Sequence, residues 1–514
     1  MAVPSSDGEA GLRKAFDGKV FNDPIHGHIE VDPLSVKIID TPQFQRLRNI
    51  KQLGGGYWLY PGACHNRFEH SLGVYYLSGR LTTELQGKQP ELDITPQDVL
   101  CVKIAGLCHD LGHGPFSHVF DQQFMKKAEP GCTWKHEDAS IEMFDHLIKQ
   151  NKINLAGYDL TQQDQTFIKE LISPPKPKEP GSWPYKGRRQ EKGFLYQIVS
   201  NSENGMDVDK WDYFARDSEC TGLSKKFDHM RLIQSARVIK VHGKWQICYR
   251  DKEWLNVYDM FYTRACLHRQ VYQHQAKVAV EMMITDALLE TDRTPGEDNK
   301  KISGARKNMD AYTRLTDSIF HKILEGEGQG KARDILENLV TRKLYRLVGE
   351  TEPGDLHLFP KSEASIAEGI FACALPEEKK KITLEDIAVN KVKVNYGMGE
   401  KNPVDSVNFW TKDKPNEAEP PKEKLSQMLP ANFADNFVRV YCKKQDKDSI
   451  EAVKRCFRVF LMKEKGETTP PKPEGSKVKD SSQHNPRTHK PPSGNAKRNL
   501  GSSMEEEAKR KKTT

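Results

Sequence analysis

The stretch Cys108-His-Asp-Leu-Gly-His-Gly-Pro-Phe-Ser-His118 decides the fold and points to the chemistry. It completes the apolar segment Asp98–Cys108, whose spacing predicts a buried helix. A charged Asp110 directly after such a helix is costly unless it has a partner. Imidazole and carboxylate are also the ligand types that suit iron, manganese, zinc or magnesium. The stretch therefore indicates an apolar helix that ends in a metal site.

Further elements are predicted on both sides of this helix. Ser140–Ile148 and Lys277–Ile284 have helical spacing, whereas Lys391–Tyr396 and Phe437–Tyr441 alternate as strands do. We therefore expect a mainly α fold with a smaller α+β lobe towards the C-terminus. The expected parts are a disordered leader at 1–18, a helical catalytic domain at 19–290, an α+β lobe at 291–464 and a disordered basic tail at 465–514.

Composition excludes several classes of protein. The 514 residues carry a formal net charge of +7, and the segment from Lys465 onwards has 12 basic against 6 acidic residues. The remainder is nearly neutral, so it is not a surface that wraps DNA by charge alone. No apolar run reaches the length of a membrane span, and Met1–Val20 is too polar for a signal peptide. Ten cysteines without a CxxC pair favour a reducing compartment.

Two more segments carry candidate ligands. His70 lies in Asn66-Arg-Phe-Glu-His-Ser71, which leads into another predicted helix. If Asp207–Asp217 is helical, its Asp209, Tyr213 and Asp217 fall on one side at i, i+4 and i+8. Taken singly, such residues are more often hydrogen-bonded or solvated surface groups. Their combination with the His-Asp pair favours a metal centre.

These segments resemble the HD-domain metal phosphohydrolases, and more closely the vertebrate family of sterile-alpha-motif and HD-domain dNTP triphosphohydrolases. The resemblance covers roughly residues 19–464. About 18 residues precede it, so the N-terminal sterile-alpha-motif domain is expected to be absent. The segments that carry the resemblance are Phe21–Glu30, Gln52–Gly56, Asn66–Ser71, Cys108–His118 and Asp207–Asp217.

The resemblance implies a metal centre with a set of acid and base groups. Iron, zinc or manganese would bind at the centre, and Mg²⁺ would accompany the nucleotides. His118, with Asp121 holding its charge, would donate a proton to the O5′ leaving group, and His136 would help to orient water. The implied metal ligands are His70, His109, Asp110 and Asp209, and the implied catalytic residues are His113, His118, Asp121 and His136.

The resemblance also implies a deoxynucleotide pocket. Arg67 and Lys210 would bind phosphates, Asp217 would bind the 3′-hydroxyl, and Gln52 with Leu53 would exclude a 2′-hydroxyl. Arg264, His268 and Tyr272 recur at i, i+4 and i+8, which by itself is typical of an ordinary half-buried helix. The Gly54–Gly56 run is no P-loop, and we expect a flexible turn there. The full set is Gln52, Leu53, Arg67, Lys210, Tyr213, Asp217, Arg264, His268 and Tyr272.

Regulation is implied by the resemblance alone, since these residues otherwise are scattered surface charges. Asp40 suits guanine because a carboxylate accepts from both N1–H and the 2-amino group. Gln275 stands where a lysine is expected, which would weaken phosphate binding. A GTP or dGTP activator would bind Lys19, Val20, Asp40, Gln45 and Arg48. A dNTP effector would bind Asn22, Arg231, Arg250, Lys252 and Asn256, with phosphate contacts from Arg342, Arg346 and Lys443.

The sequence of the tail indicates a targeting signal and a phosphorylation site. Lys497-Arg498 and Lys509–Lys512 have the spacing of a bipartite nuclear-localisation signal, although a basic end that merely aids solubility is the simpler alternative. Thr469-Pro fits a proline-directed site for a cyclin-dependent kinase. We expect a nuclear homotetramer that effector nucleotides stabilise.

The favoured function is a nucleotide-activated hydrolase that cleaves dNTPs to deoxynucleoside and inorganic triphosphate. Its implied roles are control of dNTP pools, antiviral defence with innate immunity, and DNA repair. The alternative is a single-stranded nucleic-acid-binding protein or nuclease, against which the nearly neutral body argues. Another HD hydrolase, such as a cyclic-nucleotide phosphodiesterase, would leave Leu53 and Tyr272 without a role.

Overall fold

The structure is a computed structural model, and the described residues up to Leu461 form one compact unit. None of the described helices has the length and apolar composition that a membrane crossing needs. The predicted leader, nearly all of the predicted tail, Thr469 and both basic clusters lie outside the described residues. The described residues are 17–179, 181–293, 301–326, 330–421, 426 and 428–466.

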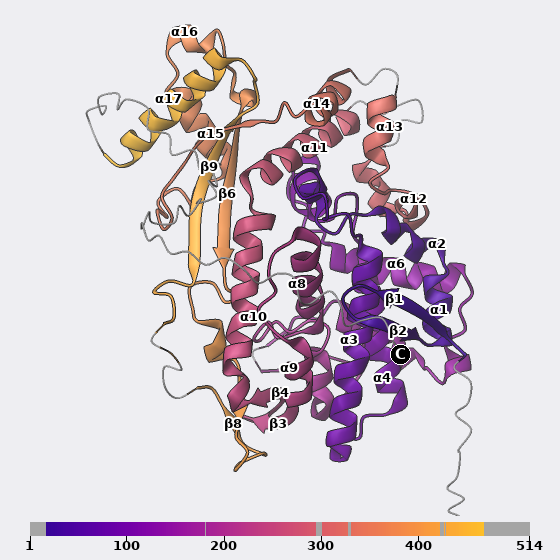
Figure 1. Ribbon diagram of the computed structural model, residues 1–514. Coiled ribbons are helices and arrows are strands. Elements are labelled where there is room, and N and C mark those ends of the chain that lie inside the picture. The colour runs from indigo at the N-terminus through magenta and orange to yellow at the C-terminus, as the bar shows by residue number, and fades with distance from the viewer. Residues whose placement is uncertain are drawn as a thin grey trace, which may run out of the picture. The chain divides into compact units, whose positions relative to one another are not determined.

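Most of the long helices of the unit pack side by side (Figure 1). The predicted buried helix is confirmed: Thr95 caps it by accepting from the Asp98 N–H, and Pro96 supplies the fixed φ of the first turn. The segments predicted as helices around Ser140 and Lys277 are also helical. These helices are α3 (Arg67–Lys88), α4 (Pro96–Cys108), α6 (His136–Gln150), α8 (Val208–Thr221), α10 (Trp254–Leu267) and α11 (Gln275–Arg293).

Two glycines allow α3 to approach its neighbours closely. A Cβ on Gly73 would lie 1.8 Å from the Asp212 carboxylate of α8, and one on Gly106 of α4 would lie 2.4 Å from Ser78 Oγ of α3. Real Cβ atoms do not tolerate such distances, so only glycine fits at either crossing. The close approach brings α4 and α8 against the same stretch of α3, from which His70 projects.

Shorter helices complete the unit. They are α1 (Pro33–Ile39), α2 (Pro42–Gln45), α5 (Met125–Ala128), α7 (Gln162–Ile172), α9 (His229–Ser235), α12 (Met309–Thr313), α13 (Ile319–Glu325), α14 (Gly330–Val340), α15 (Glu363–Ala372), α16 (Pro376–Lys379) and α17 (Lys447–Glu464). The 3₁₀ turns are Arg46–Asn49, Gly54–Trp58, Pro90–Leu92, Ala156–Tyr158, Gln190–Gln197, Asp251–Glu253, Ser303–Lys307, Leu384–Asp386 and Pro403–Ser406. The π-helical turns are Val119–Phe124 and His268–Tyr272.

Three small sheets accompany the helices. The pair β1–β2 is antiparallel, a second sheet has the order β3-β4-β7-β8, and a third has the order β5-β9-β6. The two strands predicted from alternation pair with each other along their whole length as β6 and β9. The strands are β1 (Lys19–Asp23), β2 (Gly27–Val31), β3 (Arg237–Val241), β4 (Lys244–Arg250), β5 (Arg346–Glu350), β6 (Ile387–Asn395), β7 (Phe409–Trp410), β8 (Ala418–Glu419) and β9 (Ala434–Cys442).

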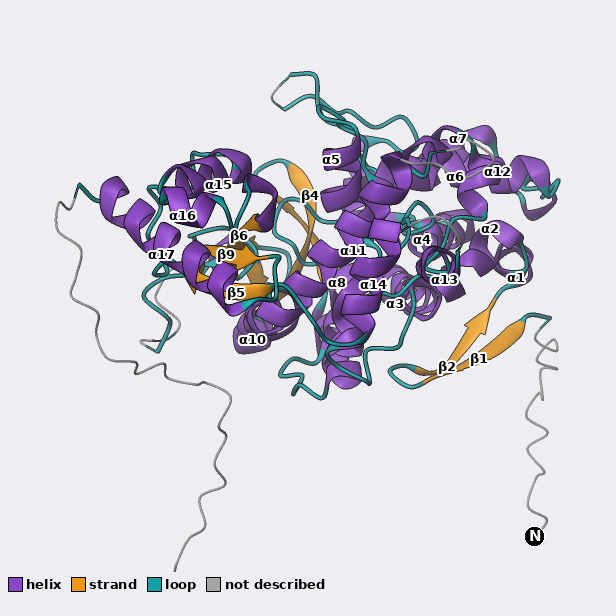
Figure 2. Cartoon of the chain, turned by 90° about the horizontal axis from the view of Figure 1, so that it is seen from above, coloured by secondary structure: helices purple, strands orange, loops and turns teal. Residues whose placement is uncertain are grey.

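The third sheet has its own core, which confirms the smaller α+β part. Figure 2 shows α15, α16 and α17 gathered on β5, β6 and β9. Val438 and Val440 pack there with Ile366 of α15 and Phe457 of α17. Other residues after the expected boundary at 290, such as Tyr312, belong to the main helical core. The exact division at residue 290 stays a prediction.

Candidate active site

The four predicted metal ligands converge on one point. His70 Nε2 lies 3.0 Å from Asp209 Oδ1 and 3.5 Å from Asp110 Oδ2, while His109 Nε2 lies 3.4 Å from both carboxylates. They come from the first turns of α3 and α8 and from the end of α4, elements that are far apart in the sequence. Two imidazoles and two carboxylates thus face each other across a few ångströms.

The second nitrogen of each imidazole is already engaged. His70 Nδ1 hydrogen-bonds Asp212 Oδ2 at 2.7 Å, and His109 Nδ1 hydrogen-bonds the Gly106 carbonyl at 2.8 Å. Such partners fix the ring orientation and leave the Nε2 lone pair free for a metal. Both Nε2 atoms are buried without a well-directed hydrogen bond. This donor set therefore fits a divalent transition metal.

The surrounding carboxylates make this point attractive to positive charge. Burial alone would lower the pKa of His70, but the carboxylates of Asp209, Asp212 and Asp110 around it raise this pKa. Asp212 is in turn held by Arg216 at 2.9 Å and by His26 at 2.6 Å. The network is a rigid support for His70.

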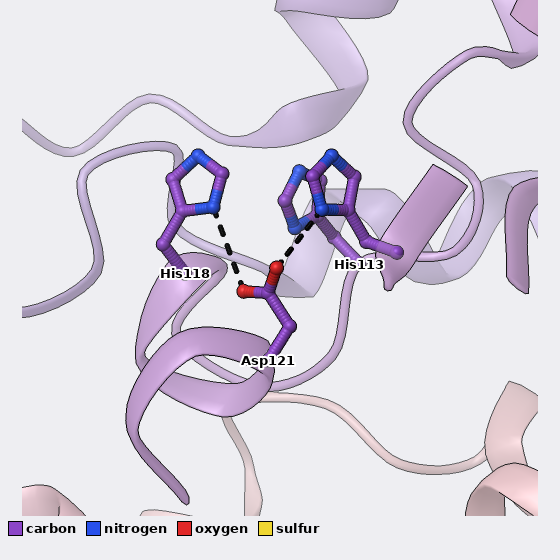
Figure 3. A group of neighbouring side chains, drawn as sticks. His113, His118 and Asp121 are labelled. Carbon is purple, nitrogen blue, oxygen red and sulfur yellow. Dashed lines mark hydrogen bonds and ion pairs between the residues drawn. The ribbon is translucent and has the colours of Figure 1, made fainter. Parts of the chain in front are cut away.

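A second cluster lies beside the first. His136 Nδ1 is 3.0 Å from Asp121 Oδ2, and His118 Nδ1 is 3.5 Å from Asp121 Oδ1, so the two imidazoles share one carboxylate. Figure 3 shows Asp121 reaching towards His118, with His113 close by. The His113 ring stacks on His136 at 3.9 Å and also lies 3.3 Å from Asp110. His113 therefore connects the two clusters.

The charge on Asp121 is stabilised by its histidines. Burial would raise the pKa of this carboxyl, but its contacts with His118 and His136 hold the pKa far below the usual range. Asp121 in turn raises the pKa of His136 against the effect of burial. A permanently ionised Asp121 can stabilise a positive charge on either imidazole.

A cavity of about 420 Å³ opens over both clusters. Two arginines line this cavity. The Arg67 guanidinium donates to Asp110 Oδ2 at 2.6 Å, and the Arg264 guanidinium donates to Asn395 Oδ1 at 2.9 Å. Lys210 is paired with Asp207 at 2.6 Å and is not among the lining residues. The predicted site residues that line the cavity are Gln52, Leu53, Arg67, Asp110, His113, His118, His136, Asp209, Tyr213, Asp217, Arg264, His268 and Tyr272.

Another part of the cavity wall is a hydrogen-bonded chain. The Tyr272 hydroxyl donates to Asp217 Oδ2 at 2.6 Å, and His65 Nε2 lies 2.7 Å from Asp217 Oδ1. The His268 ring stands edge-on to Tyr272 at 4.9 Å. Asp217 still has lone pairs for a hydroxyl in the cavity. The prediction that Asp209, Tyr213 and Asp217 share one helix is confirmed, because all three lie on α8.

The family model named HD domain matches residues 67–217, the segment that holds all four candidate ligands. The protein named deoxynucleoside triphosphate triphosphohydrolase SAMHD1 is similar to this chain in several organisms. The Gallus gallus protein is 50% identical over 88% of this chain and 76% of its own length, and the Homo sapiens protein is 51% identical over 85% and 72%. The chain belongs to the SAMHD1 family.

The family extends beyond animals. A Dictyostelium discoideum SAMHD1 homolog is 36% identical over 88% of this chain and 83% of its own length. The resemblance stated from the sequence motifs is thus confirmed over most of the chain. Membership in the SAMHD1 family and the HD match also agree with the helical fold and with a hydrolase.

Two local expectations need correction. Gly54–Gly56 is not a flexible turn: it begins a buried 3₁₀ turn, in which a Cβ on Gly55 would lie 2.8 Å from Glu281 Cγ of α11. Glycine is needed there for close packing, not for mobility.

The second correction concerns the predicted single helix that carries Arg264, His268 and Tyr272. The helix α10 ends at Leu267 and a π-helical turn follows, so the three residues do not share one regular α-helix. All three nevertheless line the cavity.

The first predicted effector group gathers on one surface. Lys19 forms an ion pair with Asp40 at 2.5 Å, and Arg48 donates to Gln45 at 2.8 Å. Gln45 also donates to the carbonyl of Ile39, next to Asp40. Val20 and Asn22 lie on the same strand as Lys19. These contacts bring the group together, but its binding role stays a prediction.

The second predicted effector group is less compact. Arg231 binds Glu253 at 2.6 Å, Asn256 donates to the same carboxylate at 3.2 Å, and Arg250 and Lys252 flank it in sequence. The predicted phosphate contacts are engaged elsewhere or lie apart: Arg342 donates to the Trp58 carbonyl, Lys443 pairs with Asp286, and Arg346 begins β5. Among the described residues, no hydrogen bond or ion pair joins them to Arg231.

Sequence reasoning missed several residues of the site. His65, Asp212, Lys277 and Glu281 each contact a predicted residue or line the cavity. His65 directly precedes the motif Asn66–Ser71, and Asp212 lies within the motif Asp207–Asp217. The presence of a histidine or an aspartate at these positions did not by itself indicate a role. Lys277 and Glu281 lie on a helix predicted only for its apolar residues, so no signal in the sequence connected them to the site.

Proposed function

We propose that this chain is a metal-dependent hydrolase that cleaves dNTPs to deoxynucleosides and inorganic triphosphate. The observation that carries the proposal is the convergence of the four candidate ligands beside a cavity whose wall holds Asp217 and Tyr272. Relatives support the proposal, because proteins named deoxynucleoside triphosphate triphosphohydrolase SAMHD1 are about half identical to this chain over most of its length.

His70, His109, Asp110 and Asp209 would hold a divalent metal. Iron, zinc or manganese suits this donor set, and Mg²⁺ would accompany the triphosphate. A metal held there would neutralise phosphate charge and polarise a phosphoryl oxygen, which makes the phosphorus atom a better target for water. Arg67 and Arg264 line the cavity and would place positive charge beside the triphosphate. Lys210 pairs with Asp207 and is also proposed to attract the phosphates by its charge.

The second cluster supplies the proton transfers. The O5′ alkoxide is a poor leaving group, so a proton must reach it as the bond to phosphorus breaks. His118 is half exposed within the cavity and can donate this proton, because Asp121 stabilises its charged form. His136 shares the same carboxylate and would orient the attacking water, while His113 stacks against it.

The sugar is selected by shape and hydrogen bonding. Asp217 would accept a hydrogen bond from the 3′-hydroxyl, and Tyr272 would pack against the deoxyribose. Gln52 and Leu53 are buried at the cavity wall, so a 2′-hydroxyl there would clash. The site would therefore reject ribonucleotides by steric exclusion.

GTP or dGTP is proposed to bind the first effector group and a dNTP the second, and both nucleotides would activate the enzyme. Nucleotides bound between subunits would favour a homotetramer by mass action. The support is the gathering of Lys19, Asp40, Gln45 and Arg48 on one surface. Asn22 of the second group lies on the same strand as Lys19, and the remaining effector residues would meet the first group across a subunit interface.

The cellular role is proposed on the family and the tail sequence. An enzyme of this kind in the nucleus would limit dNTP pools, with consequences for retroviral reverse transcription, innate immunity and DNA repair. The basic clusters Lys497-Arg498 and Lys509–Lys512 support nuclear import, and Thr469 is the proposed site for a cyclin-dependent kinase.

Product analysis tests the proposed reaction. The purified chain is incubated with dGTP, with and without GTP, and the nucleoside and phosphate products are separated. We expect deoxyguanosine and inorganic triphosphate, faster release with GTP, and near-complete loss in Asp209→Ala together with loss of bound metal. Asp145→Ala, which removes a partly exposed partner of Lys169, is the matched control and should stay active.

Other outcomes would reject the proposal. Release of monophosphate or pyrophosphate would place the cleaved bond elsewhere, and activity only on single-stranded oligonucleotides would favour the nuclease alternative. Full hydrolysis by Asp209→Ala would remove the ligand assignment.

A further inference from the structure

Lys277 and Glu281 form a buried ion pair in the wall of the active-site cavity. Both lie on α11, four residues apart, and their side chains approach to 2.5 Å. Lys277 is 6% exposed and Glu281 is 8% exposed, and both line the cavity. A buried ion pair contributes little more to stability than apolar side chains of the same size. Polar groups in a pocket, by contrast, fix the orientation of a ligand.

The carboxylate of this pair is nearly saturated. Glu281 Oε1 accepts from Lys277 and, at 3.3 Å, from the Gly55 N–H, while Oε2 faces Gln123 Nε2 at 3.5 Å. Lys277 donates only one of its three ammonium protons to Glu281. The pair as a whole therefore offers hydrogen-bond donors to the cavity rather than acceptors.

The position of Lys277 relative to Leu53 shows which part of a nucleotide it meets. Leu53 Cβ lies 2.9 Å, and Lys277 Cε lies 3.7 Å, from the point where a Cβ on Gly56 would stand. The two side chains are therefore neighbours. The proposed function puts Leu53 against the 2′ carbon of the sugar and Asp217 at the 3′-hydroxyl. The other neighbour of the 2′ carbon is the 1′ carbon, which carries the base, so Lys277 beside Leu53 is assigned to the 1′ side.

The opposite part of the nucleotide is assigned to other cations. The triphosphate is attached at the 5′ carbon, and Arg67 and the metal ligands lie together there. Lys277 follows Tyr272 in the chain, and α11 contacts the 3₁₀ turn Gly54–Trp58. Among the described residues, no hydrogen bond or ion pair joins Lys277 to Arg67 or to the metal ligands, so its ammonium is assigned to the base rather than to the phosphates.

We propose that the Lys277–Glu281 pair is a nucleobase subsite. It favours guanine and thymine, which carry a carbonyl oxygen at position 6 or 4, over adenine and cytosine, which carry an amino group at that position. The ammonium would donate to O6 of guanine or O4 of thymine and would find only a donor at the 6-amino group of adenine or the 4-amino group of cytosine. This inference rests on the proposed dNTP hydrolysis, because that activity places the sugar at Leu53 and Asp217.

A competition experiment with the unaltered chain is the first test. dITP carries a carbonyl oxygen at position 6 of the purine and a proton on N1. dATP carries an amino group at position 6 and no proton on N1. Both are added at equal concentration to one reaction with GTP, and their rates of consumption are compared. Because both share the same enzyme, any activation is common to them. We expect dITP to be consumed about tenfold faster or more, as for one hydrogen bond to a charged group. Equal rates, or faster consumption of dATP, would overturn the proposal.

The second test removes the donor without leaving a lone buried charge. The double variant Lys277→Met with Glu281→Leu should lower the dITP to dATP ratio to near one. Lys277→Arg, which keeps donors, should retain a ratio above one. The matched control is Arg333→Met with Glu337→Leu, an exposed pair of the same spacing on α14, which should keep the original ratio.

The outcomes separate this inference from the proposed function. A ratio that survives in the double variant would assign the preference to other groups and overturn the subsite. If the double variant does not fold, the comparison in the unaltered chain still decides. Failure of the unaltered chain to hydrolyse any dNTP would instead reject the proposed function.

Discussion

His65 shows how neighbours set the ionisation of one residue. It is buried, and its Nε2 lies 2.7 Å from Asp217. Burial alone would lower the pKa of its imidazole, but hydrogen bonds to Asp217 and Cys220 and the charge of Asp217 raise it to about 9. The folded protein therefore holds a proton on His65 that the unfolded chain, with a pKa near 6.5, has released at pH 8.

This difference predicts a pH dependence of stability. The folded state binds more protons between pH 6.5 and 9, so the contribution of His65 is complete below pH 6.5 and is lost as the pH rises to about 9. The full contribution is of the order of 3 kcal/mol. In His65→Gln, the fall in melting temperature between pH 7 and 9 should be smaller than in the unaltered chain.

Thermal unfolding across this pH range is the measurement. His28→Gln, which changes an exposed histidine on β2, is the control and should leave the slope as it is. An identical slope in His65→Gln would mean that His65 is uncharged in the folded protein.

At the level of elements, close contacts position the catalytic histidines. Gly112 lies directly under the first turn of α6: a Cβ there would be 2.1 Å from the His136 carbonyl and 2.3 Å from the Ser140 N–H nitrogen. The Gly112 N–H also donates to Ser140 Oγ at 2.9 Å. His136, at the start of α6, therefore depends on the absence of a side chain at 112.

Gly112→Ala should push α6 away from the HD segment. Overpacking of this kind costs about 1–3 kcal/mol, and a displaced His136 should lower kcat. Melting temperature and steady-state hydrolysis of dGTP measure the two effects. Gly87→Ala in α3, where a Cβ meets nothing within 4 Å, should cost no stability. A Gly112→Ala variant as stable and active as the Gly87→Ala control would contradict the close contact.

At the scale of the whole molecule, residues after position 290 hold the catalytic segment in place. Asp317 Oδ2 accepts from the Lys51 N–H at 2.9 Å, and its Oδ1 accepts from the Phe116 N–H at 2.6 Å. Arg46 adds a second link, because it donates to the carbonyls of His113 and Leu315. The segment that carries His113 and His118 is thus anchored by a distant part of the chain.

Asp317→Asn should weaken this anchor, since an amide has one acceptor oxygen where the carboxylate has two. One buried N–H would lose its partner at a cost of about 1–3 kcal/mol. We expect lower kcat with unchanged metal content, because no ligand of the metal is touched. Metal analysis and kinetics on the same preparation measure this. Asp310→Asn, at a partly exposed partner of His146, is the control. Loss of metal in Asp317→Asn would show that the anchor supports the first cluster as well.

Much of the site was predictable because the ligand segments are local motifs. The His-Asp pair at the end of an apolar helix, and the spacing of Asp209, Tyr213 and Asp217, predicted side chains that the structure brings to one cavity. The behaviour of Gly54–Gly56 was not predictable, since mobility and close packing both favour glycine. Only contact with Glu281 of α11 distinguishes the two.

The sequence by itself determined the helices at Asp98–Cys108, Ser140–Ile148 and Lys277–Ile284, the strands β6 and β9, and the kinds of ligand, because periodicity and side-chain chemistry are local properties. The tertiary structure alone decided which groups meet. His65 meets Asp217 across 152 positions, and the charge of its imidazole follows from that contact. Lys277 gains its place beside Leu53 in the same way. Such encounters depend on how helices cross, and no local pattern encodes a distance between residues far apart in the chain.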